Sequence, residues 1–302
     1  MVKNLVLENI SVGFKLPQGV FYAVDDVSLS LPVGNFTAII GESGCGKSVL
    51  GQAILNILPS GVVKKGSVLY NGEQVEKILS AFGIIPQNPS ESLNPVRKIG
   101  KQMQDILAVH NIADSDNSYK KQCLHLFGLQ EADRVLAAYP HELSGGMLQR
   151  VLCAMAVSSK PEWILADEPT KGLDEQVGAI VRKNLLTIKQ DLHLSMLIIT
   201  HDIALAQEVC DDVLVMYAGQ VLEHNADIWH KPLHPYTKGF LKALPKNGLQ
   251  VIPGKAPVPG ESFTGCKFAA RCPYCTTRCK EEKPAMQQVG NAEVRCFLYA
   301  EG

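Results

Sequence analysis

The hydrophobic residues of the chain gather in short apolar runs that alternate with longer stretches of helical periodicity. The runs are Phe36 to Ile40, Gly83 to Ile85, Trp163 to Ala166 and Met196 to Thr200. Continuous apolar strands that alternate with helices are typical of a parallel sheet covered on both faces. The pattern therefore predicts an α/β fold with a parallel sheet core.

Two segments depart from this alternation. Leu5 to Phe14 and Phe21 to Leu31 have the pattern of strands joined by a loop with Pro and Gly, which predicts an antiparallel β layer. Between Asn88 and Ser159 strand-like runs are scarce, whereas Ile99 to His110 and Ser118 to Phe127 have helical periodicity. We interpret residues 88–159 as a helical subdomain inserted into the core.

The composition shifts to Pro, Gly and Cys after Ala243, and the periodicity ends there. We place a domain boundary near Pro245, between a core at 1–245 and a Pro- and Cys-rich extension at 246–302. Five of the nine cysteines lie in this extension. In a reducing cytosol, thiols that cluster in this way favour metal ligation over disulfides.

Length and charge exclude some classes of protein. The 302 residues, 46% of them hydrophobic, are enough to bury a full core. The formal net charge of -1 argues against general nucleic-acid binding. The sequence has no recognisable secretory signal and no apolar stretch of the roughly 18 residues that a membrane-spanning helix needs. We expect a cytoplasmic protein, one that can dock on a membrane partner.

The residues that follow the first apolar run fit the phosphate-binding pattern G-x-x-x-x-G-K-[ST]. In such a P-loop, glycines let backbone N–H groups surround the β-phosphate, Lys47 meets the β and γ oxygens, and Ser48 ligates Mg²⁺. The loop precedes the helical run Val49 to Leu58, as this mechanism requires. The pattern alone fits kinases, GTPases and ATPases equally well. Its members are Gly41, Glu42, Ser43, Gly44, Cys45, Gly46, Lys47 and Ser48.

Polar residues stand at the ends of three further predicted strands, where parallel sheets carry their ligand sites. Asp167 can hold Mg²⁺, and Glu168 can polarise an attacking water. His201 can donate to the γ-phosphate or position the water, and Gln87 can sense Mg²⁺ or water. Taken alone, each could also be a structural residue at a strand end.

The segment Leu143 to Met147 narrows the class of protein. Ser144, Gly145 and Gly146 open a helical run and make a second helix N-terminus that can bind an anion. A protein with one nucleotide has no obvious use for two such cradles in one site.

The ordered motifs resemble those of ATP-binding-cassette (ABC) ATPases over about residues 5–245. They are the P-loop, Gln87, LSGGM, WILADEP, Gly172-Leu173-Asp174 and His201. The resemblance implies a P-loop NTPase fold with a RecA-like core, and ATP hydrolysis with Mg²⁺. It further implies head-to-tail pairing with a second ATPase, whose nucleotide is contacted by Ser144, Gly145, Gly146, Met147 and Asp174.

The same resemblance implies an aromatic residue that stacks on adenine. By spacing we choose Phe14, with Tyr22 in reserve. Met147 replaces the commoner Gln, and Lys171-Gly172 stand where small residues are usual. Glu168, His201 and Ser144 are present, so neither departure predicts an inactive site.

The cysteines of the extension leave three interpretations open from spacing alone: a four-thiolate Zn²⁺ site, an iron–sulfur cluster, or unrelated buried thiols. The extension resembles that of the oligopeptide, dipeptide and nickel importer branch of ABC ATPases. Ile252-Pro-Gly, Gly265-Cys266, Arg271-Cys272-Pro273 and the upstream His234-Pro-Tyr-Thr237 carry this resemblance. Some members hold a [4Fe-4S] cluster, which implies the ligands Cys266, Cys272, Cys279 and Cys296, with Cys275 as an alternative.

These resemblances imply an ATPase subunit on the cytoplasmic face of the membrane that drives peptide uptake. Its implied partners are a second ATPase subunit, two transmembrane permease subunits and, indirectly, an extracytoplasmic binding protein. Import of nickel or another chelated metal is one alternative. A soluble ABC ATPase of translation or DNA repair is another, although such proteins usually carry two cassettes or a coiled-coil insertion. His224, His230 and His234 invite a nickel site, but we interpret them as solvated surface residues.

Overall fold

The computed structural model describes residues 4–17, 19–74, 81–258 and 261–300. It divides into two compact units. The first unit consists of Met1–Pro32, Thr37–Glu76 and Cys210–Gly302, and the second of Val33–Phe36 and Lys77–Val209. The boundary near Pro245, which was drawn on composition, stays a prediction.

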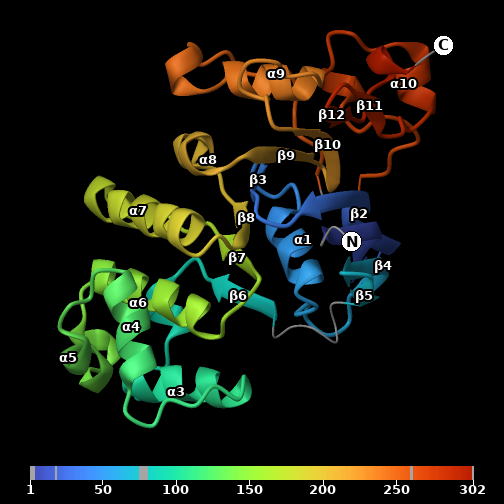
Figure 1. Cartoon of the computed structure of the whole chain (residues 1–302). Coiled ribbons are helices and arrows are strands. Elements are labelled where there is room, and N and C mark those ends of the chain that lie inside the picture. The colour runs from blue at the N-terminus through green and yellow to red at the C-terminus, as the bar shows by residue number, and fades with distance from the viewer. Residues whose placement is uncertain (1–3, 18, 75–80, 259–260, 301–302) are drawn as a thin grey trace. The chain divides into compact units, whose positions relative to one another are not determined.

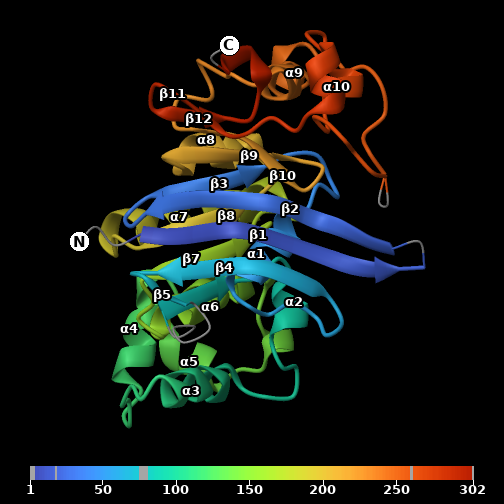
Figure 2. The ribbon, with the colours of Figure 1, turned by 90° about the vertical axis from the view of Figure 1, so that its right-hand side faces the viewer.

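The predicted antiparallel layer is a four-stranded sheet of the first unit, in the order β2-β1-β4-β5 (Figure 2). Its strands are β1 (Asn4–Leu16), β2 (Gly19–Pro32), β4 (Val63–Tyr70) and β5 (Glu73–Gln74). Alternate residues of β1, among them Leu5 and Leu7, are buried, as the period of two in a half-buried strand requires. The apolar pattern predicted β1 and β2, whereas β4 and β5, with more polar residues, were not predicted.

The first unit also contains β3 (Phe36–Ile40) from Thr37 onward, which pairs in parallel with β9 (Asp212–Tyr217). From β9 onward the pairing is antiparallel, through β10 (Gln220–Asn225) and β12 (Ala292–Val294) to β11 (Gln287–Val289). The core sheet therefore has an antiparallel edge that the apolar runs did not predict. The extension contributes the β11–β12 hairpin directly to the sheet.

Short helices complete the first unit. The helix after the P-loop, α1 (Lys47–Ile54), is shorter than the predicted run to Leu58 because Asn56 adopts a left-handed backbone conformation with φ 53°. Figure 1 shows the remaining helices in the orange and red part of the ribbon, together with β11 and β12. They are α9 (Pro235–Lys242), η4 (Pro245–Asn247), η5 (Ala269–Arg271), α10 (Thr277–Glu281) and η6 (Phe297–Tyr299).

The second unit combines a parallel sheet with helices, as predicted. Its strands β6 (Phe82–Ile85), β7 (Trp163–Asp167) and β8 (Ser195–Ile199) pair in the order β8-β7-β6. The helix α6 (Gly145–Ser158) is apolar on nearly all sides and buried, and it packs against α3 (Ile99–Val109), α4 (Ser118–Leu126), α7 (Glu175–Asp191) and β6. The other helices are α2 (Pro89–Ser92), α5 (Ala132–Ala137), η3 (Pro140–Glu142) and α8 (Ile203–Val209).

Among the residues that the structure describes, none of the helices combines the length and the apolar character that crossing a bilayer requires.

Candidate nucleotide-binding site and cysteine cluster

The P-loop joins β3 to α1 in a conformation that requires glycine. Gly41 and Gly46 have φ angles of 151° and 103°. A Cβ atom on Gly41 would lie 2.2 Å from the carbonyl oxygen of Met216, and one on Gly46 would lie 2.1 Å from that of Ala23. Both distances are far below van der Waals contact, so the loop keeps its shape only with glycine at these positions.

The ammonium group of Lys47 lies inside the curve of the loop. Lys47 is only 7% exposed, and its Nζ donates to the carbonyl oxygens of Gly41 (2.9 Å) and Glu42 (3.1 Å). The loop also rests on the β9–β10 turn, because the N–H of Gly219 donates to the Cys45 carbonyl (2.9 Å). Burial raises the pKa of the Cys45 thiol, which therefore stays protonated at neutral pH. The structure thus gathers the predicted phosphate-binding residues around one buried cation.

The two aromatic candidates for adenine stacking have different surroundings. Tyr22 and the P-loop residue Gly44 line a common cavity of about 330 Å³ in the first unit. Lys65 Nζ lies 5.4 Å from the centre of the Tyr22 ring. Phe14 is half-buried on β1 opposite Phe21 and is not among the residues that line this cavity. Which of the two meets adenine stays a prediction.

Glu168 and His201, which the sequence placed at two strand ends, lie together in the second unit. His201 Nδ1 is 2.6 Å from Glu168 Oε2, and the backbone N–H of His201 donates to the same oxygen at 3.3 Å. Glu168 has a φ of 48°, in the left-handed region that non-glycine residues avoid. Its N–H donates to the carbonyl oxygen of Ile199 (2.7 Å) and helps to hold this conformation. Strain of this kind is concentrated at functional sites.

Residues that the sequence did not point to fix the loops around Glu168. Gln149 of α6 donates from its buried side chain to the carbonyl oxygen of Pro169 (3.2 Å). Thr170 Oγ1 donates to a carboxylate oxygen of Asp202 at 3.2 Å, and Asp202 also caps the start of α8. These contacts join segments far apart in sequence, and only the adjacency of Asp202 to His201 could have pointed to one of them.

The predicted signature residues stand at helix N-termini of the second unit. Ser144 Oγ accepts a hydrogen bond from the N–H of Met147 (3.3 Å), and Asp174 caps α7 by accepting from the N–H of Val177 (2.9 Å). Gly145 is exposed, and Gln87, which follows β6, is exposed as well. Ser144 and Asp174 therefore each have a local capping role beside the role that the resemblance implies.

Four cysteines of the extension line one cavity of about 170 Å³ in the first unit, together with His234 and Phe268. They are Cys266, Cys272, Cys279 and Cys296, while Cys275 is not among the lining residues. Burial, reinforced by the neighbouring thiols, raises the pKa of Cys266 to about 11. All nine cysteines are free thiols. Within the described ranges, no group of three or more His, Cys, Asp or Glu side chains has a metal-binding arrangement.

Comparison with known proteins places these features in a family. A model described as "ABC transporter" matches residues 24–171, and one described as "Oligopeptide/dipeptide transporter, C-terminal region" matches residues 222–279. The chain is 34% identical to the oligopeptide transport ATP-binding protein OppD of Haemophilus influenzae, over 98% of each chain. It is 36% identical to the dipeptide transport ATP-binding protein DppD of Escherichia coli, over 95% of this chain and 94% of that one.

The chain belongs to the ATP-binding proteins of the ABC transporter family. This membership makes it an ATPase and excludes a simple P-loop kinase. Solved structures of ABC proteins agree with the fold. A cassette dimer in a post-hydrolysis state with ADP and Pi gives a TM-score of 0.62 at 26% identity, covering 72% of this chain and 96% of that one. The cbiO1 protein from Clostridium perfringens gives a TM-score of 0.61 at 26% identity, covering 75% and 90%.

His224, His230 and His234, which suggested a nickel site, have separate partners in the structure. His224 pairs with Asp212 (2.8 Å) and Glu293 (3.2 Å), whereas His230 pairs with Asp227 (2.9 Å). His234 is buried, caps α9, and has a pKa lowered to about 3 by burial. Their interpretation as solvated surface residues is also wrong for His224 and His234, which satisfy internal hydrogen bonds instead.

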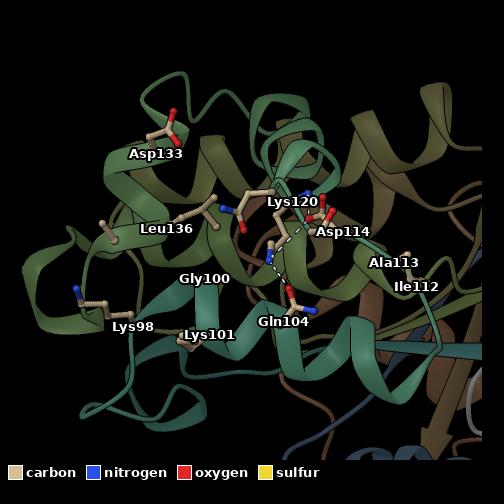
Figure 3. Close-up of a pocket in the computed structure, with 13 residues that line it drawn as sticks. Lys98, Gly100, Lys101, Gln104, Ile112, Ala113, Asp114, Lys120, Asp133 and Leu136 are labelled. Carbon is tan, nitrogen blue, oxygen red and sulfur yellow. Dashed lines mark hydrogen bonds and ion pairs between the residues drawn. The ribbon is translucent and has the colours of Figure 1, made fainter.

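The helical part of the second unit contains a cavity of about 700 Å³. None of the predicted site residues lines it. Figure 3 shows Lys120 reaching from α4 toward Asp114 and Gln104. Asp114 also accepts from the backbone N–H groups of Tyr119 and Lys120, both at 3.0 Å. The buried pair is therefore satisfied within the fold and anchors the start of α4.

Proposed function

We propose that this ABC ATPase is the energy-supplying subunit of a peptide importer. The observation that carries the proposal is similarity along nearly the whole chain to proteins named for oligopeptide and dipeptide transport, including the C-terminal region. That region favours a transporter over a soluble ABC protein of translation or DNA repair. We also propose the division into a cassette at 1–245 and an extension at 246–302.

The P-loop of the first unit binds the phosphates of ATP in this proposal. The N–H groups of Gly41 to Ser48 and the Lys47 ammonium take up the negative charge of the β- and γ-phosphates. Bound Mg²⁺ would neutralise further phosphate charge, held by Ser48, Gln87 and Asp167. Phe14 stacks on adenine, with Tyr22 as the alternative.

Hydrolysis uses the pair of the second unit. Glu168 polarises the attacking water, and His201, hydrogen-bonded to its Oε2, orients that carboxylate and positions the water toward the γ-phosphate. The signature residues act on the nucleotide of a partner ATPase. They are Ser144, Gly145, Gly146, Met147 and Asp174.

The proposed partners are a second ATPase subunit, either a sister chain or a copy, and two transmembrane permease subunits at the cytoplasmic face of the membrane. An extracytoplasmic binding protein delivers the peptide to the permease. We propose no nucleic-acid partner. Binding of Mg-ATP by the purified chain, its loss in Lys47→Ala and co-purification with the permease test this assignment. Recovery of ribosomes or DNA in place of a permease would contradict it, and uptake of chelated nickel but no peptide would move the substrate class.

We further propose that Cys266, Cys272, Cys279 and Cys296 hold a [4Fe-4S] cluster, with Cys275 as the alternative ligand and Zn²⁺ as the alternative metal. Four thiols that line one cavity supply the donor set that such a cluster takes. Anaerobically purified protein should be brown and contain about four iron and four sulfide per chain. Stoichiometric zinc without iron would contradict the cluster.

A further inference from the structure

The P-loop residue Glu42 is held by three groups of the first unit. Its N–H donates to Tyr236 Oη (3.1 Å), and its carbonyl oxygen accepts from Lys47 Nζ (3.1 Å). Both carboxylate oxygens accept from Arg271 Nη1, at 3.1 and 3.2 Å. Two of these partners, Tyr236 and Arg271, come from the C-terminal part of the chain. The start of the P-loop is therefore anchored by residues far from it in sequence.

Arg271 is itself fixed by packing. Its side chain is 7% exposed, and its Nε donates to the carbonyl oxygen of Pro253 (3.1 Å). Nη1 also donates to Tyr217 Oη at 3.2 Å, and the guanidinium lies over the rings of Tyr217 and Phe268, 5.6 and 6.0 Å from their centres. A planar guanidinium held in this way loses little further freedom when it pairs with a carboxylate.

The charge of Glu42 explains why such an anchor matters. Its carboxylate belongs to the loop that receives the polyphosphate of ATP, and an uncompensated negative charge there would repel the nucleotide. Arg271 neutralises this charge. Because it also holds the Glu42 side chain in place, it helps to orient the carbonyl oxygens of Gly41 and Glu42 toward Lys47.

We propose that Arg271 is a positioning residue of the nucleotide site, which compensates the charge of Glu42 and fixes the first turn of the P-loop. The inference rests on the proposed binding of ATP at this loop. Arg271 ends the short helix η5 and directly precedes Cys272. The cysteine-rich extension therefore supports ATP binding within its own chain, in addition to any metal that it holds.

The test is a double-mutant cycle on the purified full-length chain, with the dissociation constant of Mg-ATP measured by competition against a fluorescent ATP analogue. Arg271→Gln should weaken ATP binding about tenfold or more, because the Glu42 carboxylate would then stand beside the phosphates without its compensating charge. In a Glu42→Gln background, Arg271→Gln should weaken ATP binding by less than about threefold, since no negative charge is then left uncompensated. This coupling is a readout that a purely structural role of Arg271 would not produce.

Arg278→Gln is the matched control. Arg278 lies in the same extension, is 53% exposed and pairs with Glu282, without contact to the P-loop. It should bind ATP as the wild type does. The inference is overturned, and the proposed function stands, if Arg271→Gln binds ATP with wild-type affinity. The same holds if Arg271→Gln weakens ATP binding equally with Glu42 and with Gln at position 42, or if Arg278→Gln weakens it as much. Absence of ATP binding by the wild-type chain, with no further loss in Lys47→Ala, overturns both.

Discussion

Two helices of this protein begin at glycine-rich segments, and glycine has a different purpose in each. At the P-loop before α1, Gly41 and Gly46 have positive φ angles, and backbone carbonyls of other strands lie where a Cβ would be. At the start of α6, Gly145 has no positive φ, and a Cβ there would meet nothing within 4 Å. The P-loop needs glycine for its backbone conformation, whereas at the start of α6 glycine leaves the space beside the helix free of a side chain.

This difference explains what each segment can bind. The P-loop is curved and closed around Lys47, so it can surround the phosphates of a nucleotide that is bound to its own chain. The start of α6 has a capping hydrogen bond at Ser144 and an exposed Gly145 after it, which suits a ligand brought by another molecule. Geometry within a single chain therefore agrees with the proposed division between own and partner nucleotide.

The largest effect is expected at Gly46. Gly46→Ala should lose ATP binding and destabilise the protein by about 3 kcal/mol or more, because its Cβ would overlap the carbonyl oxygen of Ala23. The measurements are chemical denaturation and the dissociation constant of Mg-ATP. Gly72→Ala is the control, since Gly72 has a φ of 82° but a Cβ there would meet nothing within 4 Å. Gly72→Ala should lower the free energy of unfolding by only about 1 kcal/mol. Equal losses in the two variants would show that backbone conformation, and not packing, demands glycine in the P-loop.

A smaller and more selective effect is expected at α6. Gly145→Leu should change the stability of the isolated chain by less than about 0.5 kcal/mol, because the side chain would point into open space. In the assembled transporter it should lower ATP hydrolysis on the order of 100-fold, since it would misplace the partner's nucleotide. Assembly and ATPase assays with co-expressed subunits measure this. A parallel loss of ATP binding by the isolated chain would contradict the division between the two segments.

The sequence predicted those parts of the molecule whose signal is local. Strands β3, β7 and β8 are continuous apolar runs, and α3 and α4 have the helical period over a full face, so pattern alone was sufficient. Hairpin β11–β12 is short and polar, and it is a strand pair because β12 pairs with β10, a tertiary cause that no local pattern carries.

The site divides in the same way. Phosphate-binding and acidic residues could be predicted because each motif is contiguous, with the residues that carry its chemistry in adjacent positions. Arg271 and Glu42 are separated by 229 positions, and Gln149 and Pro169 meet only through the packing of α6. The histidines were misinterpreted for the opposite reason. Closeness in sequence suggested a common environment, whereas His224 lies on a strand and His234 at a helix cap.

The smallest effect is expected at His224, on the sheet that carries the P-loop. It is an effect on stability, and the start of α6 should be unaffected. Burial alone would lower the pKa of His224, but its hydrogen bonds to Asp212 and Glu293 outweigh burial and raise it above 6.5. A raised folded-state pKa means that this contribution to stability is full below pH 6.5 and is lost as the pH rises through the folded value. Asp212 begins β9, the strand whose Met216 carbonyl lies against Gly41.

His224→Gln should therefore lower Tm by about 2 °C at pH 6, where a hydrogen bond to the charged ring is lost, and by less at pH 8. His230→Gln is the control, because His230 is exposed and pairs only with the neighbouring Asp227 among the described residues. Its effect on Tm at pH 6 should be smaller than that of His224→Gln, because ion pairs on the surface contribute little to stability. If the difference between wild type and His224→Gln grew with pH instead, His224 would stabilise β9, β10 and β12 as a neutral ring, and the support under the P-loop would not depend on its charge.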